Sequence, residues 1–109
     1  MVSDEQAEKA LHYLRTNAPK AAQAKAERVY MEEFRKTVKS TVMRDHLDKP
    51  VTAQEREAYA SEQYQTHLEA IKEAIQADEF NRWGMVAASA TLDAWRTFNA
   101  NQRGEKKMF

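Results

Sequence analysis

Residues 80–98 read FNRWGMVAASATLDAWRTF, and this stretch decides how the rest of the chain must fold. At about 100° per residue on a helical wheel, its apolar side chains point to almost every side. A helix that is apolar all round needs neighbours all round. In a chain of 109 residues, we expect those neighbours to be its other helices together with a second copy or another protein.

The composition is typical of long helices. Gly and Pro occur only twice each, and charged residues make up 31% of the chain. We therefore expect one all-α domain over residues 1–109. No apolar run reaches the roughly 20 residues of a membrane span, and the first residues lack the pattern of a signal peptide. This pattern predicts a cytoplasmic protein without membrane contact.

The start of the chain predicts a short helix followed by a long one. Ser3 and Gln6 have the form of a capping box. Pro19 disfavours helix at the residue before it and suits the first turn of the next helix. We therefore expect helices over about residues 4–15 and 19–46.

A third helix is expected over about residues 52–102, followed by a basic tail at 103–109. It begins after Pro50, with a capping box formed by Thr52 and Glu55. Its first half can pack along the second helix as a long antiparallel hairpin. At about 1.5 Å per residue it measures roughly 75 Å, against roughly 40 Å for the second helix. Its second half therefore extends beyond the hairpin.

Apolar side chains spaced three or four residues apart predict the packed face of each long helix. On the third helix they are Tyr64, Leu68, Ile71 and Ile75. On the second helix every step is four residues, and the predicted face consists of Ala22, Ala26, Tyr30, Phe34, Val38 and Val42.

The surplus half of the third helix predicts a homodimer. A sharp bend at residues 81–84 that folds the end back is the alternative, and we favour the second copy. The expected dimer contacts are the bulky apolar residues Phe80, Trp83, Met85, Val86 and Leu92.

Charge changes sign along the chain although its net value is zero. Residues 18–47 hold seven basic and four acidic side chains, whereas residues 48–79 hold three basic and eight acidic ones. Such blocks suit antiparallel neighbours that attract. A basic face on the second helix is also a possible nucleic-acid-binding site, formed by Lys25, Arg28, Arg35, Lys36 and Lys39.

Catalytic and cofactor motifs are missing from the sequence. It contains no cysteine, no Gly-rich phosphate loop and no nucleophile elbow. None of His12, His46 and His67 has a carboxylate at a recognised metal-ligand spacing. We expect neither an enzyme nor a metal, cofactor or small-molecule substrate.

Two segments resemble a known group of proteins. The chain has EKALHYL at residues 8–14 and WRTFNANQR at residues 95–103. These fit the patterns E-K-A-L-x-[F/Y]-L and W-R-[S/T]-x-N-A-N-x-R, which resemble a group of small helical bacteriophage proteins of about this length. The resemblance implies an early-region phage product inside a bacterial cell, often in the company of recombination genes, and implies no particular activity.

If the first helix packs on residues 85–98, the two motif segments meet in one place. Interface energy concentrates in residues such as Trp and Arg, so this composite is the expected partner-binding site. Its members are Leu11, Leu14, Trp95, Arg96, Asn99 and Arg103.

Three functions fit these observations. The favoured hypothesis is a small phage-encoded interaction module that binds or inhibits a host or phage protein of DNA metabolism or defence. The second is a recombination accessory that binds single-stranded DNA. The third is a structural or assembly component of the virion.

Overall fold

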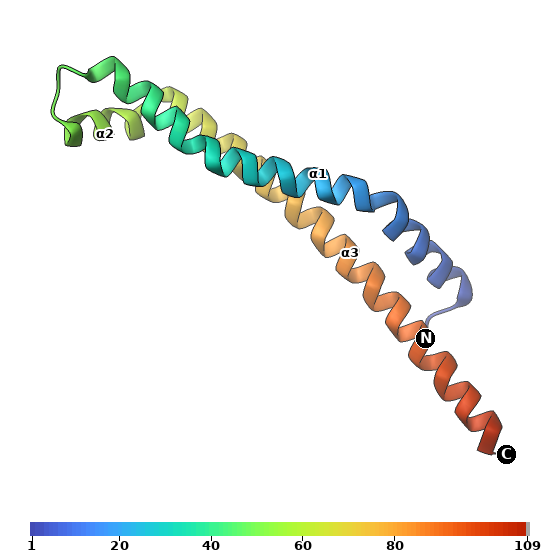
Figure 1. The fold of residues 1–109 in the computed structure, drawn as a ribbon. Helices are drawn as coiled ribbons and strands as arrows, with labels where there is room; N and C mark the ends of the chain where they lie inside the picture. The colour runs from blue at the N-terminus through green and yellow to red at the C-terminus, as the bar shows by residue number, and fades with distance from the viewer. Residues whose placement is uncertain (109) are drawn as a thin grey trace. The chain divides into compact units, whose positions relative to one another are not determined.

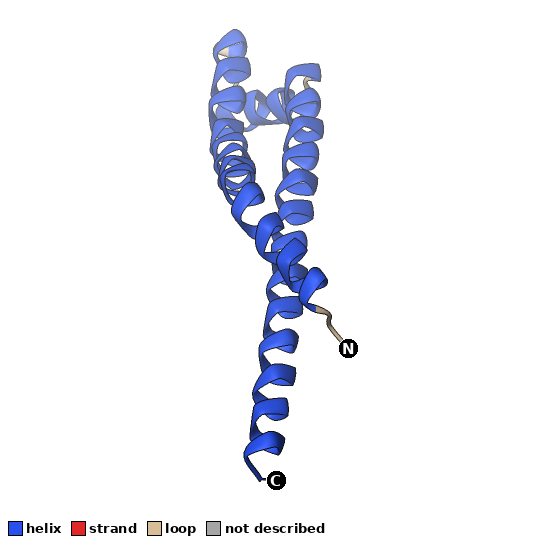
Figure 2. Ribbon diagram, turned by 90° about the vertical axis from the view of Figure 1, so that its right-hand side faces the viewer, coloured by secondary structure: helices blue, strands red, loops and turns tan. Residues whose placement is uncertain are grey.

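The computed structural model describes the backbone of residues 1–108 and the side chains of residues 1–105 (Figures 1 and 2). Helix α1 spans Asp4–Met43, the short 3-10 helix η1 spans Arg44–His46, α2 spans Val51–Ala60 and α3 spans Glu62–Met108. No strand occurs within residues 1–108. The predicted all-α class is confirmed.

The helices contribute to two compact units. Unit 1 consists of Met1–Ala22 and the chain from Glu79 onward, and unit 2 consists of Gln23–Asp78. Each unit contains one part of α1 and one part of α3. In each unit, residues later in α1 contact residues earlier in α3, so the two helical segments run antiparallel. The antiparallel hairpin expected from the sequence is confirmed in this form.

In unit 2 the antiparallel pairing is fixed by polar contacts. Arg28 Nη1 donates to Asp78 Oδ2 at 3.1 Å. The Nε2 atom of the buried His67 lies 2.7 Å from the carbonyl oxygen of Met31, and it must carry the hydrogen because a carbonyl only accepts. The buried apolar side chains of this unit are Val42, Ala58, Ile71 and Ala74.

In unit 1 the packed side chains are small. Ala7 and Ala10 of α1 and Ala88 of α3 are buried. Small residues let two helix backbones approach closely but remove little apolar surface from water. At the start of α1, the capping box predicted for Ser3 and Gln6 is confirmed by two reciprocal hydrogen bonds of 2.9 and 3.1 Å.

The predicted break between the first two helices is wrong, because α1 continues through Pro19. Pro19 lacks the N–H that would bond to the carbonyl of Arg15. Strong helix formers follow it, with four alanines among residues 20–26. Propensity and packing on both sides therefore outweigh the loss of one hydrogen bond.

The predicted single helix over residues 52–102 is also wrong, since it is interrupted at Ser61. This residue has an extended backbone, with φ −68° and ψ 151°. Its hydroxyl donates to the carbonyl of Ala58 at 2.6 Å and accepts the N–H of Tyr64 at 3.1 Å, so it ends α2 and caps α3. Helix α3 then continues to Met108, through most of the predicted basic tail, whereas Phe109 lies outside the described residues.

Two further expectations for this part of the chain fail. The structure shows no side-chain cap at the start of α2, where Pro50 occupies the N-cap position, so the predicted capping box of Thr52 and Glu55 is absent. The alternative of a sharp bend at residues 81–84 is excluded, because α3 passes through them as continuous helix.

The predicted packed face of the second helix is largely exposed. Tyr30 is 60% exposed and Phe34 is 38% exposed, whereas Val42 is buried as expected. Ala24 and Met31 are half-buried instead. Each four-residue step moves a side chain about 40° around the helix, so a row of such steps turns away from the neighbouring helix. Side chains that stay against a long antiparallel neighbour are spaced alternately by three and four residues.

Candidate functional site

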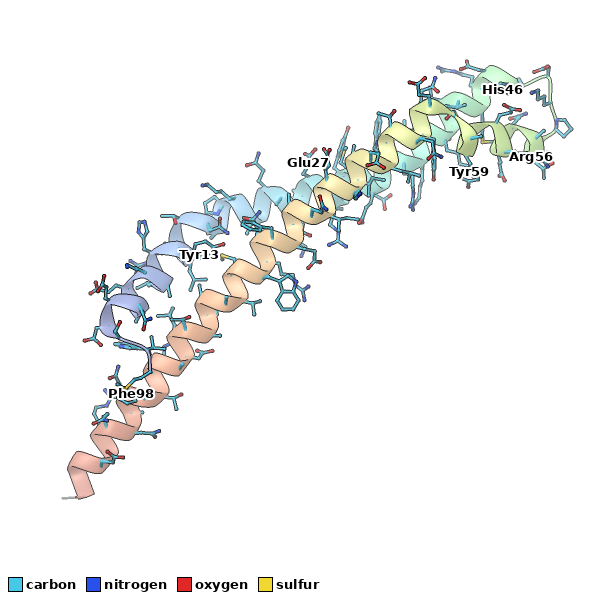
Figure 3. The ribbon with its side chains drawn as sticks, turned by 180° about the vertical axis from the view of Figure 1, so that it is seen from behind. Tyr13, Glu27, His46, Arg56, Tyr59 and Phe98 are labelled. Atoms are coloured by element: carbon cyan, nitrogen blue, oxygen red, sulfur yellow. The ribbon has the colours of Figure 1, made fainter. Side chains whose placement is uncertain are left out.

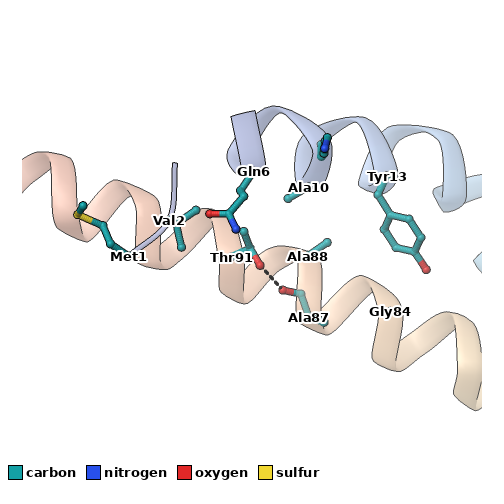
Figure 4. Close-up of a pocket in the computed structure, with 10 residues that line it drawn as sticks. Met1, Val2, Gln6, Ala10, Tyr13, Gly84, Ala87, Ala88 and Thr91 are labelled. Atoms are coloured by element: carbon teal, nitrogen blue, oxygen red, sulfur yellow. Dashed lines mark hydrogen bonds between the residues drawn. The ribbon is translucent and has the colours of Figure 1, made fainter. Parts of the chain in front are cut away.

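An open groove runs between α1 and α3 in unit 1 (Figure 4). Its volume is about 600 Å³, and most of the side chains around it are apolar. Small residues on both helices leave this space unfilled. The lining residues are Met1, Val2, Gln6, Lys9, Ala10, Tyr13, Gly84, Ala87, Ala88 and Thr91.

One end of the groove is closed by the contact of Tyr13 with Gly84. The Tyr13 side chain reaches from α1 towards α3 (Figures 3 and 4). A Cβ atom at Gly84 would overlap the Tyr13 hydroxyl and would lie 3.0 Å from its Cζ atom. Glycine in a helix interior costs roughly 0.5–1 kcal/mol relative to alanine, and here it gives space to an aromatic ring.

We expect the effect of Gly84→Ala to depend on Tyr13. In the native background the new methyl group overlaps the phenol, so the substitution should be neutral or destabilising. In a Tyr13→Ala background the same substitution should raise the free energy of unfolding by up to about 1 kcal/mol, because only the gain in helix propensity remains. Urea unfolding of the four proteins measures this coupling.

Gly104 supplies the matched control, since it is also helical and a Cβ atom there would meet nothing within 4 Å. Gly104→Ala should have the same small effect in both backgrounds. An identical effect of Gly84→Ala with and without Tyr13 would contradict the contact.

Trp95 contacts the first turn of α1 and not the motif segment at residues 8–14, whose Tyr13 lies against Gly84. Its indole N–H donates to Asp4 Oδ1 at 2.8 Å, which ties α3 to the first turn of α1. Trp95, Leu14 and Asn99 are half-buried, while Leu11 is exposed. The structure therefore brings the first turn of α1 to Trp95 in unit 1, but it does not assemble the predicted site. Leu11 and Leu14 lie beside Tyr13 in the sequence, and Tyr13 packs on Gly84, eleven residues or roughly 16 Å of helix before Trp95.

The two arginines of the predicted partner-binding site are exposed. Arg96 lies 3.4 Å from the carboxylate of Asp93 on the same helix, and Arg103 is further along α3. Their role in binding a partner stays a prediction.

The predicted dimer contacts separate into two groups. Phe80, Trp83 and Val86 are exposed. Met85 and Leu92 are half-buried and, at about 100° per residue, fall on the side of α3 that carries the buried Ala88. Only the first group is freely accessible to a second copy.

Two members of the predicted nucleic-acid-binding face are engaged within unit 2. Arg28 lies between Glu32 and Asp78, at 3.0 and 3.1 Å. Lys39 lies over the Tyr59 ring, 4.9 Å from Nζ to the ring centroid, and 3.5 Å from Glu55. These pairs are partly buried, with the Asp78 side chain only 14% exposed, and they hold both cations against carboxylates of unit 2.

The same contacts raise the pKa of Lys39 above its ordinary value of 10.5. Interaction with the Tyr59 side chain is the largest cause; desolvation opposes it, and the charge of Glu55 adds to it. Because the pKa is higher in the folded state, this interaction stabilises the fold at neutral pH and is lost as the pH rises through the pKa of the folded state.

The other three basic residues, Lys25, Arg35 and Lys36, are exposed. Lys36 lies 3.4 Å from Glu33 one helical turn earlier. The five cations therefore do not present one uninterrupted basic face.

Within the part of the chain that the structure describes, no three His, Asp or Glu side chains are grouped as metal ligands. No helix among those residues combines the length and the apolar character needed to cross a membrane.

The groove itself was not predicted from the sequence. Its signal was Gly84, the one glycine in a long helical stretch, which we interpreted as a possible bend. The partner, Tyr13, lies 71 residues earlier in the sequence, and no local pattern connects the two.

Comparisons with models of known protein families, with curated proteins and with solved structures found no match for the chain.

Proposed function

We propose that this chain is a small interaction module whose unit 1 binds another protein. The observation that carries the proposal is the open apolar groove of about 600 Å³ between α1 and α3. Apolar concave surfaces with a few polar groups at their border are typical binding sites, and amphipathic helices commonly occupy grooves between helices. The expected ligand is an apolar segment of a partner protein.

The surroundings of the groove favour a particular segment. Its lining includes the small residues Ala10, Ala87 and Ala88, so large side chains of a partner can enter. Lys9 lies at its border and is exposed, where it can attract an acidic residue at the edge of the bound segment. The predicted contact residue Leu11 is exposed on the same part of α1.

The resemblance to small phage proteins supports a setting for this activity. A phage product made early in infection acts on proteins already in the bacterial cell. We therefore propose a host or phage protein of DNA metabolism or defence as the partner. Direct binding of single-stranded DNA has less support, because Arg28 and Lys39 are held by carboxylates within unit 2.

Val2→Asp tests the proposal. Val2 lines the groove and precedes α1, so a carboxylate there enters the groove without interrupting a helix. Burying it against the partner's apolar side chains should weaken binding at least about tenfold. The measurement is quantitative capture from bacterial lysate by the immobilised native chain and by the variant, followed by titration of the purified partner.

Val51→Asp is the matched control, since Val51 is an exposed valine at the start of α2 in unit 2. It should retain the partner fully. Capture that is equal for both variants, or no selective capture, would contradict a binding groove. Salt-sensitive binding of a labelled single-stranded oligonucleotide would instead favour the DNA hypothesis.

A further inference from the structure

The outer side of α3 in unit 1 carries an exposed apolar face that the groove does not account for. Phe80, Trp83 and Val86 are 78%, 58% and 47% exposed. On the helical wheel they share roughly a third of the circumference with three exposed alanines, opposite the buried Ala88. We define the outer face as Phe80, Trp83, Val86, Ala87, Ala90 and Ala94.

Side-chain size is ordered along this face. Its bulky members, Phe80 and Trp83, come first, and its small members, Ala90 and Ala94, come last. A second copy in parallel would place bulky groups on bulky groups and leave a gap between the alanines. An antiparallel copy places Phe80 against Ala94 and Trp83 against Ala90, so that each large side chain meets a small one.

Charges along one edge of the face select the same arrangement. Glu79 lies 3.2 Å from Arg82, and Asp93 lies 3.4 Å from Arg96. Along α3 these charges therefore alternate as negative, positive, negative, positive. In an antiparallel pair related by a two-fold axis, this edge meets the same edge of the other helix. Glu79 then faces Arg96, and Arg82 faces Asp93, whereas in a parallel two-fold pair this edge would meet the opposite edge of the other helix and these four charges would not face one another.

Both observations specify one register. The pairing of Phe80 with Ala94 and the pairing of Arg82 with Asp93 are each centred close to Ala87. We propose that a second copy of this chain docks antiparallel on the outer face of α3, with the two-fold axis near Ala87. Such an isologous contact is self-complementary and closed. Ala87 is the one member of the outer face that also lines the partner-binding groove. The inference rests on the exposure, side-chain size and charge order along α3 and not on what the groove binds.

The absence of cysteine from the sequence allows a direct test of the register. With single cysteines introduced under mild oxidation, Ala87→Cys should form a disulfide-linked dimer, because the two copies of that position lie near the axis. Ala94→Cys alone should not, but a mixture of Phe80→Cys and Ala94→Cys chains should cross-link. Cross-linking by Ala94→Cys alone in preference to Ala87→Cys would overturn the antiparallel register.

Charge reversal tests the dimer without introduced cysteines. Arg82→Glu places a negative charge opposite Asp93 of the partner subunit at both symmetric sites, and it should raise the dimer dissociation constant several-fold. The double variant Arg82→Glu/Asp93→Arg should restore it. Lys20→Glu, an exposed reversal on α1, is the control and should leave it unchanged.

The readout is the molar mass by light scattering over a concentration series, with helical content checked by circular dichroism. The native chain should approach twice its mass of 12.6 kDa. A native chain that stays monomeric at every concentration would overturn the proposal. So would a double variant no better than Arg82→Glu alone.

Discussion

Replacing Ile71 by alanine should lower the free energy of unfolding by about 2–4 kcal/mol, the range expected for truncating a buried aliphatic side chain. Ile71 is only 7% exposed, and the other buried apolar side chains of the described residues are valine or alanine. It is therefore the largest of them. A small domain has a total stability of about 5–15 kcal/mol, so this change should shift the urea unfolding midpoint strongly.

Leu68 provides the matched control, because it is an aliphatic residue on the same helix that is 36% exposed. Leu68→Ala should cost about 1 kcal/mol or less, since part of its side chain is already in water. Circular dichroism during urea titration measures both. Equal losses for the two variants would mean that Ile71 does not occupy the centre of unit 2.

Replacing Pro19 by alanine should stabilise the protein, by about 1–3 kcal/mol. Pro19 is exposed within α1, so no packed contact of its ring offsets the cost of proline in a helix interior, which is about 3 kcal/mol relative to alanine. Part of the gain is lost because alanine also makes the unfolded chain more flexible.

Thermal and urea unfolding of Pro19→Ala, compared with Lys20→Ala at the neighbouring exposed site, measure this gain. The lysine variant should change the free energy of unfolding by less than about 0.5 kcal/mol. A loss of stability in Pro19→Ala would show that the proline ring makes contacts that stabilise α1.

The class of fold was predictable because composition alone favours helices. Two glycines and two prolines leave few places for turns, and Pro50 marked one of them correctly. Pro19 misled because a proline predicts a break only when the flanking sequence is weakly helical. Ser61 was missed because Tyr64, and not Glu or Gln, follows it by three residues, so the sequence lacks the capping-box pattern although the hydroxyl does accept the N–H of Tyr64.

The packed faces were harder to predict because the packed residues are not the most apolar ones. In α1 the buried or half-buried positions include Ala10, Asn17, Ala24 and Arg28. Tyr30 and Phe34 are more apolar and lie outside. Side-chain size and polar partners on the facing helix determine which residues pack between two closely spaced helices. A hydrophobic pattern in the sequence contains neither kind of information.

The candidate site was predictable only in part. The first helix was expected to pack on residues 85–98 and to bring Leu11 and Leu14 to Trp95. The helix does pack there, but Trp95 bonds to Asp4, and Leu14 lies beside Tyr13 near Gly84. The groove depends on Tyr13 and Gly84, whose contact joins distant parts of the sequence. A tertiary contact of this kind has no local signature.

Photo-crosslinking tests the proposal of a protein-binding groove most directly. A benzophenone amino acid is introduced at Lys9, on the border of the groove, or at Lys20, an exposed position of α1 that does not line it. On illumination in bacterial cells, the Lys9 position should give an adduct with another protein, and Lys20 should give much less. The absence of an adduct at Lys9, or the same adduct at both positions, would contradict the proposed site.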